Sequence, residues 1–358
     1  MTFGARALIR LDALQHNLRV IRSASPGTKI MAVIKANAYG HGMLPVAQSI
    51  SDVDAFAVAR LAEALELRAA GIQTPVVLLA GVSSDVELSQ AIQHQFQIVV
   101  HCPEQIDLLE KHGDGKAVVW LKIDTGMHRL GFDPEQASEL IQRMRDCTAV
   151  EDLRLMSHLA SADERGNTAT AEQIAKFSEL TENFSGPVSI ANSAGATGWP
   201  ALQGDVWIRP GIMLFGLSPF ADQTAADLGL KPVMQFEARL IAKKPLKKGA
   251  LVGYGGRYTA PEDTTLGIIS AGYGDGYKRH FRSGTPVLIN SRKVPLIGNV
   301  SMDMIAVDLG KNADDQIGDV AVLWGDGLPV EEVAPWADAI PYDLVCGVMN
   351  REAAKIID

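Results

Sequence analysis

The sequence has few cysteines and no paired cysteine motif. Its 358 residues include only three cysteines, Cys102, Cys147 and Cys346, which lie far apart. An odd number at such spacing fits neither a disulfide framework nor a CxxC metal site. We therefore expect a protein that keeps its thiols reduced, and we assign no residue to a metal.

Two further absences narrow the class of protein. No apolar run approaches the roughly 20 residues that a membrane-spanning helix requires, and the charged start MTFGARALIRLDALQHNL lacks the apolar core of a signal peptide. Basic residues are in deficit, with 33 Lys and Arg against 42 Asp and Glu. We therefore expect a cytoplasmic protein whose main partner is neither a membrane nor a nucleic acid.

The remaining composition is that of a globular enzyme. Hydrophobic residues make up 47% of the chain and charged residues 21%, which is the usual balance for a soluble, folded protein. The length corresponds to one large or two ordinary domains.

From residue 30 to about 218 the chain repeats a short apolar run, a turn and an amphipathic stretch. The apolar runs are of strand length and almost continuously hydrophobic, as expected for strands buried on both faces of a parallel sheet. They are 29–35, 55–59, 75–81, 96–101, 117–124, 153–160, 188–194 and 206–216. Eight strands alternating with helices predict a (β/α)8 TIM-type barrel. A doubly wound open sheet also alternates, but usually with fewer strands.

Helical patterns separate these runs. The clearest cover 60–70, 83–94, 103–112 and 134–146. Several begin with signals for a helix start, such as Pro103 followed by Glu104 and Pro134 followed by Glu135.

After about residue 231 the pattern changes to β-branched or alternating runs without long helices. Gly, Pro and Asn recur at hairpin spacing, and Asn290-Ser291 is one expected turn. We expect a barrel domain over 1–230, followed by a mostly antiparallel β domain over 231–358 with a short helical stretch near 330–350. The strand-like segment at the start, within 1–10, is expected to pair with this second domain.

Polar side chains follow the apolar runs of the expected barrel, where active sites of this fold lie. Lys35 ends the first run, Lys122 lies in the fifth, Arg129 follows the fifth, and His158 ends the sixth. Asn192 and Ser193 end the seventh, and Arg209 lies in the eighth. A single such residue is usually solvated or locally paired, but five strands contribute to the same rim.

These residue types indicate a site for an anionic small molecule. The loops after the last two strands are the usual phosphate position in this fold, and Ser193 with the backbone N–H groups of Gly211 and Ile212 can hold a phosphate. Lys35 at a buried strand end is expected to have a depressed pKa, which suits an amine that forms a Schiff base. A phosphate site with an internal lysine indicates pyridoxal 5'-phosphate (PLP).

Longer motifs carry a resemblance that covers nearly the whole chain. AVIKANAYGHG (32–42) resembles the cofactor-attachment signature of bacterial alanine racemases, which are PLP-dependent enzymes of fold type III. Further matches are LKIDTGMHRLGF (121–132), SHLASAD (157–163), IANSAGA (190–196), RPGIMLFG (209–216), VGYGGRY (252–258), AGYGDGY (271–277), GNVSMDM (298–304) and PYDL (341–344). Barrels that share only the attachment motif lack the later ones.

The resemblance implies a two-base proton transfer on a PLP external aldimine. Lys35 would hold the cofactor and act as one base, and Tyr254 would act as the other. Because the α-proton leaves one face of a planar carbanion and returns to the other, one base on each face is the simplest solution. His158 matches a residue that hydrogen-bonds the tyrosine, and Arg209 matches the residue facing the pyridine nitrogen.

The resemblance also implies roles for the remaining residues. Arg129, Met302 and Asp303 match the substrate position, and Lys122 matches a lysine that is carbamylated in many members. Tyr273 and Arg279 match the entrance to the site. The set that binds the phosphate end of PLP would be Tyr39, Ser193, Gly211, Ile212 and Tyr342, and Asn192 would be a further cofactor-binding residue.

The implied enzyme is a homodimer with active sites shared between subunits. It interconverts L- and D-alanine, either to supply D-alanine for peptidoglycan or to degrade it. The main alternative is a broad-specificity racemase of small amino acids such as serine on the same scaffold. A non-catalytic PLP carrier would lack the β domain and Tyr254, and a PLP-dependent decarboxylase would have an acidic residue in place of Arg209.

Overall fold

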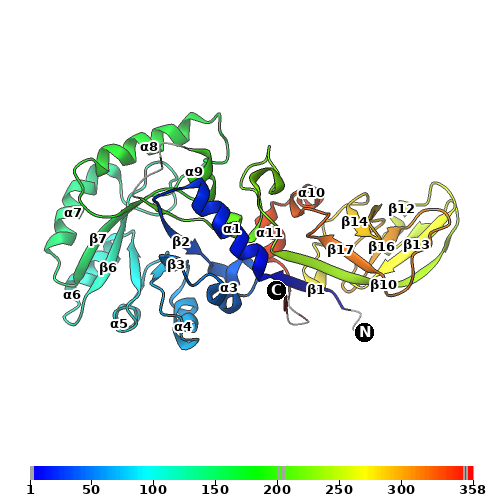
Figure 1. Ribbon diagram of the computed structural model, residues 1–358, viewed down its shortest axis with the longest axis horizontal. Coiled ribbons are helices and arrows are strands. Elements are labelled where there is room, and N and C mark those ends of the chain that lie inside the picture. Colours follow the sequence, from blue (N-terminus) through cyan, green and yellow to red (C-terminus); the bar gives the residue numbers. More distant parts are fainter. Residues whose placement is uncertain (1–3, 200–201, 203–205, 350, 352–353, 358) are drawn as a thin grey trace.

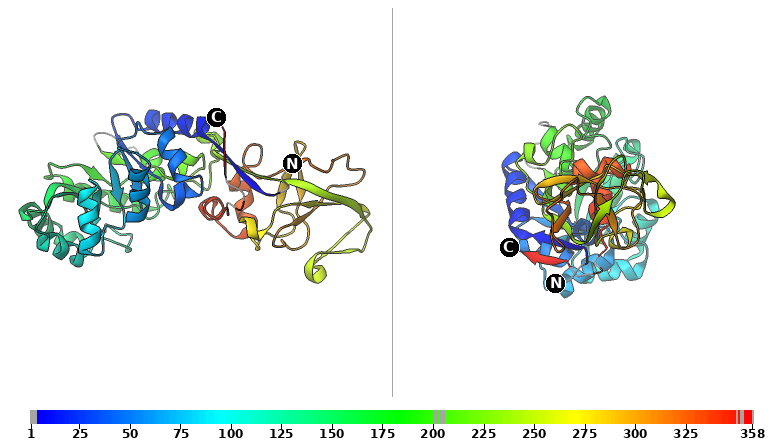
Figure 2. Two further views of the ribbon diagram at one scale, coloured as in Figure 1. Left: turned by 90° about the horizontal axis from the view of Figure 1, so that it is seen from below. Right: turned by 90° about the vertical axis from the view of Figure 1, so that its right-hand side faces the viewer.

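The computed structural model describes residues 4–199, 202, 206–349, 351 and 354–357. The molecule is elongated and has two lobes, a barrel with surrounding helices at one end and a β lobe at the other (Figure 1). The same two lobes are seen when the molecule is turned by 90° about its long axis (Figure 2, left). Among the described residues, no helix combines the length and apolar character needed to cross a membrane.

The first lobe is the predicted barrel of eight strands. Neighbouring strands are parallel, in the order β8-β7-β6-β5-β4-β3-β2-β9. Between β8 and β9 the ring is joined by an isolated bridge of Asn192 to Arg209. The strands are β2 (Lys29–Val33), β3 (Ala55–Val58), β4 (Val76–Leu78), β5 (Gln97–Val100), β6 (Ala117–Lys122), β7 (Val150–Met156), β8 (Val188–Ser189) and β9 (Trp207–Ile208).

Several strands are shorter than the apolar runs that predicted them. β2 ends at Val33, so Lys35 lies two residues beyond it, and His158 likewise follows β7. The run at 206–216 is only partly a strand, since β9 is followed by Pro210 and the 3-10 helix η3 (Ile212–Phe215). Proline has no N–H for the sheet ladder, and the buried apolar residues after it pack as a helical turn. Hydrophobicity therefore predicted burial correctly and overestimated strand length.

Helices surround the barrel at the predicted places. Those with sequence signals are α4 (Leu61–Ala69), α5 (Asp85–Gln93), α6 (Pro103–Lys111) and α7 (Ala137–Asp146), the last preceded by η1 (Pro134–Gln136). The Ser84 hydroxyl caps α5 by accepting the N–H of Glu87, as the side chain of an N-cap residue does. The other helices are α1 (Leu11–Ala24), α2 (Lys35–Tyr39), α3 (Met43–Ser49), α8 (Thr168–Thr181) and α9 (Ser193–Gly198).

The second lobe is built on one mostly antiparallel sheet. Its strands are β1 (Arg6–Arg10), β10 (Met234–Leu246), β13 (Thr264–Ile269), β14 (Pro286–Ile289), β15 (Arg292–Pro295), β16 (Ile305–Asp308), β17 (Val320–Trp324) and β18 (Lys355–Ile357), with β11 (Leu251–Val252) and β12 (Tyr258–Thr259) as a separate pair. The first strand, β1, pairs antiparallel with β10 and parallel with β18. The two ends of the described chain therefore meet in this lobe (Figure 1).

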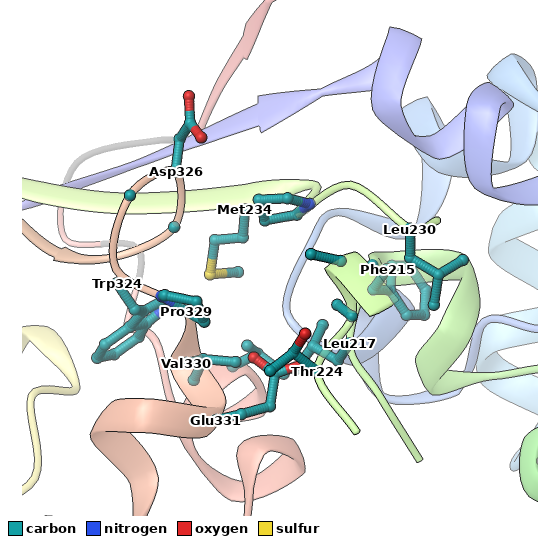
Figure 3. A pocket seen from close by; sticks show the side chains of 17 residues that line it. Phe215, Leu217, Thr224, Leu230, Met234, Trp324, Asp326, Pro329, Val330 and Glu331 are labelled. Atoms are coloured by element: carbon teal, nitrogen blue, oxygen red, sulfur yellow. The ribbon is translucent and has the colours of Figure 1, made fainter. Parts of the chain in front are cut away.

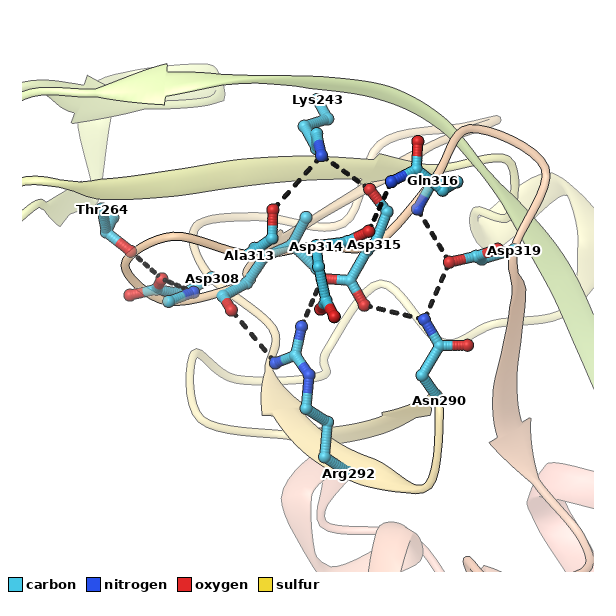
Figure 4. Close-up of polar contacts among 12 residues, drawn as sticks. Lys243, Thr264, Asn290, Arg292, Asp308, Ala313, Asp314, Asp315, Gln316 and Asp319 are labelled. Carbon is cyan, nitrogen blue, oxygen red and sulfur yellow. Dashed lines mark hydrogen bonds and ion pairs between the residues drawn. The ribbon is translucent and has the colours of Figure 1, made fainter.

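A polar network around the buried carboxylate of Asp315 anchors one loop of the second lobe. The turn Asn290-Ser291 joins β14 to β15 with positive φ at both residues, 46° and 63°, as a two-residue hairpin requires. Asn290 and Arg292 beside this turn both bond the buried carboxylate of Asp315. Lys243 of β10 donates to the carbonyls of Ala313 and Asp315 (Figure 4). These bonds tie the loop before β17 to the sheet.

The last helices bring the second lobe into contact with the barrel. They are α10 (Val330–Val333), η7 (Ala334–Ala337) and α11 (Pro341–Cys346). Gly40, directly after α2, packs so closely on α11 that an added Cβ would overlap the carbonyl oxygen of Val345. This contact places Tyr342 and Cys346 of α11 at the mouth of the barrel.

Candidate active site

A cavity of about 580 Å³ lies at the carboxyl ends of the barrel strands. Side chains from the loops after β2, β6, β7, β8 and β9, together with α11, line it. It brings together most of the predicted site residues, namely Lys35, Tyr39, Lys122, Arg129, His158, Asn192, Ser193, Arg209, Gly211, Ile212 and Tyr342.

Lys35 enters this cavity from an unusual backbone segment. Four residues directly after it, none of them glycine, have φ of 53° to 54°: Ala36, Asn37, Ala38 and Tyr39. They form a left-handed turn (residues 36–39), a conformation that costs L-residues roughly 1–2 kcal/mol each. Such strain persists only where the surrounding structure imposes it, and it clusters at functional sites.

The environment of Lys35 favours its neutral amine. Partial burial lowers the pKa of Lys35, and the nearby Arg129 and Arg209 lower it further. Glu63 acts in the opposite direction. An uncharged amine is the form that attacks an aldehyde or accepts a proton.

The same cavity contains a cradle for an anion, formed by the Ser193 hydroxyl and the backbone around Gly211. The N–H of Gly211 donates to the Ser193 hydroxyl at 3.0 Å, and the N-terminal ends of α9 and η3 begin at Ser193 and Ile212. A Cβ at Gly211 would overlap the Tyr39 hydroxyl, so only glycine lets these groups approach one another. Burial raises the pKa of Tyr39, which keeps its hydroxyl a donor.

Arg209 lines the cavity, and hydrogen bonds hold both terminal nitrogens of its guanidinium. Its guanidinium donates to the Ser189 hydroxyl at 2.5 Å, to the Ser157 carbonyl at 2.7 Å, to His158 Nδ1 at 3.0 Å and to the Ile190 carbonyl at 3.2 Å. Burial lowers the pKa of Arg209 to about 10, so it remains charged at neutral pH.

The bond from Arg209 fixes the state of His158. Arginine only donates hydrogen bonds, so Nδ1 of the histidine must be the unprotonated nitrogen. Burial and the nearby cations, Arg209 first, hold the pKa of His158 well below its usual value. The ring is therefore neutral, with its proton on Nε2.

The part of the cavity that is lined by Lys122, Arg129 and Arg209 is strongly cationic. Desolvation, followed by the charges of Arg209 and Arg129, lowers the pKa of Lys122 to about 8. Asp124 accepts the N–H groups of residues 126, 127 and 128 and thereby shapes the turn that leads to Arg129. Within the described part of the chain, no carboxylate forms an ion pair with Lys35, Lys122, Arg129 or Arg209. The donor set therefore fits an anionic ligand, as a phosphorylated aldehyde with a substrate carboxylate would be.

The other predicted site residues lie outside this cavity, on the β lobe. Tyr254, in η5 (Tyr254–Gly256), is 74% exposed, Met302 is 54% exposed and Tyr273, in η6 (Tyr273–Asp275), is 40% exposed. Asp303 and Arg279 are also exposed. The loops of Tyr273 and Met302 are joined by backbone hydrogen bonds from residues 273 and 274. One chain by itself therefore does not bring these side chains to Lys35.

Three contributors to the site were not predicted from the sequence. Glu63 accepts the N–H of Ala36 at the start of the left-handed turn; its position three residues after Arg60, at the start of a helix, was the available signal. Ser189 holds Arg209 and has no sequence signal. Cys346 lines the cavity, and its spacing of one helical turn from Tyr342 could have indicated this.

A second cavity, of about 370 Å³, lies between the lobes (Figure 3). Phe215, Leu230, Met234 and Trp324 make much of its lining, which contains no lysine, arginine or histidine. Asp326 and Glu331 are the charged residues of its described lining, so it lacks the cationic anchors for an anion that the cavity at the barrel mouth has.

The fold and the site define a class of protein: a two-lobed barrel enzyme that uses PLP, with a lysine, several further cations and an anion-binding cradle in one cavity. Comparison with known proteins narrows the class. The model of the alanine racemase N-terminal domain matches residues 9–219, and that of the C-terminal domain matches residues 233–356. The chain belongs to the alanine racemase family.

Individual relatives agree over the full length. The chain is 50% identical over 350 residues to an alanine racemase of Vibrio parahaemolyticus serotype O3:K6, covering 97% of this chain and 98% of the relative. It is 48% identical over 350 residues to that of Vibrio cholerae serotype O1, covering 97% of each. The biosynthetic alanine racemase from Pseudomonas aeruginosa superposes with a TM-score of 0.96, at 40% identity and with 100% of both chains covered.

A further solved structure bears on the cofactor. The alanine racemase from Bartonella henselae, solved with covalently bound pyridoxal phosphate, has a TM-score of 0.88, 30% identity and 99% coverage of both chains. The predicted family, fold class and PLP dependence are thus confirmed. The alternative of a broad-specificity racemase is not favoured by relatives that are named alanine racemases.

Proposed function

We propose that this chain interconverts L-alanine and D-alanine with PLP as its cofactor. The observation that carries the proposal is the placement of Lys35 and the phosphate cradle in one cationic cavity. When bound, PLP supplies an electron-withdrawing ring that acidifies the α-proton of an attached amino acid.

The residues of the cavity divide between the two ends of the cofactor. When PLP is bound, Lys35 would provide the amine for its aldehyde, and the charged Arg209 would keep its pyridine nitrogen unprotonated. An unprotonated ring withdraws electrons less strongly, and this limits side reactions such as transamination. The phosphate is held by Tyr39, Ser193, Gly211, Ile212 and Tyr342, and Asn192 is a further cofactor-binding residue.

Proton transfer is divided between two bases on opposite faces of the substrate. Lys35 is the base for D-alanine by its match to the family's lysine, and its lowered pKa favours the neutral amine that a base requires. Tyr254 serves L-alanine and comes from a second copy of the chain, since in its own chain it is 74% exposed and absent from the lining of the cavity. The active enzyme is therefore a homodimer with shared active sites.

His158 assists Tyr254. A tyrosine of ordinary pKa, about 10, is a poor base at neutral pH unless its phenolate is stabilised. The neutral ring of His158 carries its proton on Nε2, because Arg209 donates to Nδ1. That Nε2–H is free to donate to a tyrosine oxygen.

Substrate binding is assigned to Arg129 for the carboxylate, together with Met302 and Asp303. Lys122 is a candidate for carbamylation, which would replace a repelled cation by an anion beside Arg129. Carbamate formation requires a neutral amine, and a pKa of about 8 makes that form far more abundant at neutral pH than in an exposed lysine. Intact mass under gentle conditions tests this, because the adduct adds the mass of one CO2.

The remaining assignments concern the entrance to the active site, the domain boundaries and the cellular role. Tyr273 and Arg279 line the entrance to the site, and Tyr342 narrows it, so substrates with small side chains are preferred. One extra methylene group on a substrate changes its relative free energy of binding by only about 1–3 kcal/mol. We propose domains over 1–230 and 231–358, with β1 contributed to the second sheet, and a cytoplasmic role in supplying D-alanine for peptidoglycan or in degrading it.

The deciding experiment is incubation with L-alanine in deuterated water, with and without added PLP. Chiral separation and proton NMR would follow D-alanine and loss of the α-proton together. PLP-dependent D-alanine with deuterium at Cα is the expected result. Exchange without inversion would remove Tyr254 or the dimer from the mechanism, and no exchange at all would refute the proposed activity.

A further inference from the structure

His41 is a buried histidine next to the site to which the proposed mechanism gives no role. Its side chain is fully buried, and Nδ1 lies 3.0 Å from the carbonyl oxygen of Ala38 and 2.9 Å from that of Tyr39. Carbonyl oxygens only accept hydrogen bonds, so the proton of the ring must be on Nδ1. Among the described residues, Nε2 has no hydrogen-bond partner.

The two carbonyls bonded by His41 belong to the left-handed turn (residues 36–39). This turn has no intrinsic preference for its conformation, because L-residues favour the right-handed form. The Nδ1–H of His41 therefore provides a hydrogen-bond donor to the carbonyl oxygens at the end of this strained turn. Its Nε2 is left buried without a hydrogen-bond partner among the described residues.

Glu63 holds the other end of the same turn. Its Oε1 accepts the N–H of Ala36 at 2.7 Å, and its Oε2 accepts the N–H groups of Ala59 at 2.8 Å and Arg60 at 3.0 Å. The carboxylate thus fastens the start of the turn to the loop between β3 and α4.

The position of the His41 ring is fixed by packing. It stacks on Phe215, with centroids 4.4 Å apart and planes at 23°, and Phe215 also contacts the ring of Tyr39 at 5.0 Å. Burial lowers the pKa of His41 to about 4, so the ring is a neutral donor at any pH where the enzyme would work.

We propose that His41 and Glu63 are positioning residues that lock the left-handed turn, so that Lys35 before it and Tyr39 at its end face the same ligand. The inference rests on the proposed function, in which Lys35 engages the aldehyde of PLP and Tyr39 its phosphate. The spacing of these two groups depends on the hand of the turn, since relaxation toward a right-handed turn would rotate Tyr39 away from Gly211 and Ser193.

Two variants of His41 separate the hydrogen bond from the packing. His41→Phe keeps an aromatic ring on Phe215 but has no donor, whereas His41→Asn places an amide N–H near the position of Nδ1. The dissociation constant for PLP is measured by fluorescence titration of cofactor-depleted protein, and kcat and KM for L-alanine are measured on the PLP-saturated dimer.

For His41→Phe we expect PLP binding weakened by about tenfold or more and a reduced kcat, as for the loss of one buried hydrogen bond. The KM for alanine should stay near that of wild type, because the substrate carboxylate is bound elsewhere. His41→Asn should restore both quantities to within about threefold of wild type. Wild-type PLP affinity and kcat in His41→Phe, or equal losses in the two variants, would overturn the proposal.

Glu63→Gln tests the opposite end of the turn and does not require a change in the core. The amide retains one acceptor oxygen in place of two, so we expect weaker PLP binding, a lower kcat and an unchanged KM for alanine. Normal PLP affinity in this variant would also count against the proposal. Because PLP affinity is measured independently of turnover, a wild-type protein that fails to racemise alanine would refute the proposed function and leave the effect of His41 measurable.

Discussion

Lys122 provides a direct test of the charge balance in the cavity. Its ammonium is almost completely buried, and the nearest charges, Arg209 and Arg129, are also positive. Replacing it with methionine, which has a similar shape and no charge, removes the desolvation of the ammonium and its repulsion by the two arginines. We expect Lys122→Met to stabilise the cofactor-free fold at pH 7.

The size and sign follow from the pKa. Folding lowers the pKa of Lys122 from 10.5 to about 8, and each tenfold change in proton affinity corresponds to about 1.4 kcal/mol. Charged Lys122 therefore costs the folded state about 3 kcal/mol below pH 8. Between about pH 8 and 10.5 the unfolded chain binds more protons than the folded one, so stability rises with pH and the cost disappears above that range.

Urea unfolding of the cofactor-free protein at fixed protein concentration measures this difference. The buffers are depleted of CO2, since carbamylation would remove the charge. Lys122→Met should exceed wild type in its free energy of unfolding by about 3 kcal/mol at pH 7, with the gap closing toward pH 10; Lys116→Met, at an exposed position directly before the same strand, should show no gap. A methionine variant no more stable than wild type at pH 7, or a gap independent of pH, would refute the reasoning.

Three further outcomes are expected. Tyr254→Phe should lower racemisation by roughly a thousandfold or more without changing Tm, since the side chain is 74% exposed; a lower Tm with retained activity would argue against a catalytic role. Gly211→Ala should weaken PLP binding in fluorescence titrations, because its Cβ would overlap the Tyr39 hydroxyl, and unchanged affinity would mean that the cradle tolerates a methyl group. His158 should stay neutral from pH 8 to 6 in 15N NMR, because Arg209 lowers its pKa; a midpoint near 6.5 would contradict the bond to Arg209.

The local sequence was sufficient to predict the barrel architecture and most of the residues that line the cavity. Continuous apolar runs separated by amphipathic helices admit few arrangements other than parallel strands covered on both faces, and parallel strands in a closed barrel bring their carboxyl ends to one rim. Lys35, Lys122, His158 and Arg209 could therefore be grouped before any coordinates, since each follows or lies in such a run.

Only the tertiary structure decided how those residues are held and what charge they carry. None of residues 36–39 is a glycine, so nothing in their local sequence indicates a left-handed turn. Their left-handed form depends on contacts with Glu63 and His41, which local propensity does not encode. The pKa of Lys122 depends on burial and on arginines brought in from other strands. Tyr254 lies outside the cavity of its own chain, a separation that follows from the packing of two lobes. Hydrophobic periodicity and short motifs involve residues that are close in the sequence, so they can be recognised without a structure. The left-handed conformation of residues 36–39, the desolvation of Lys122 and the position of Tyr254 outside the cavity depend on contacts between distant segments, so they are determined only by the tertiary structure.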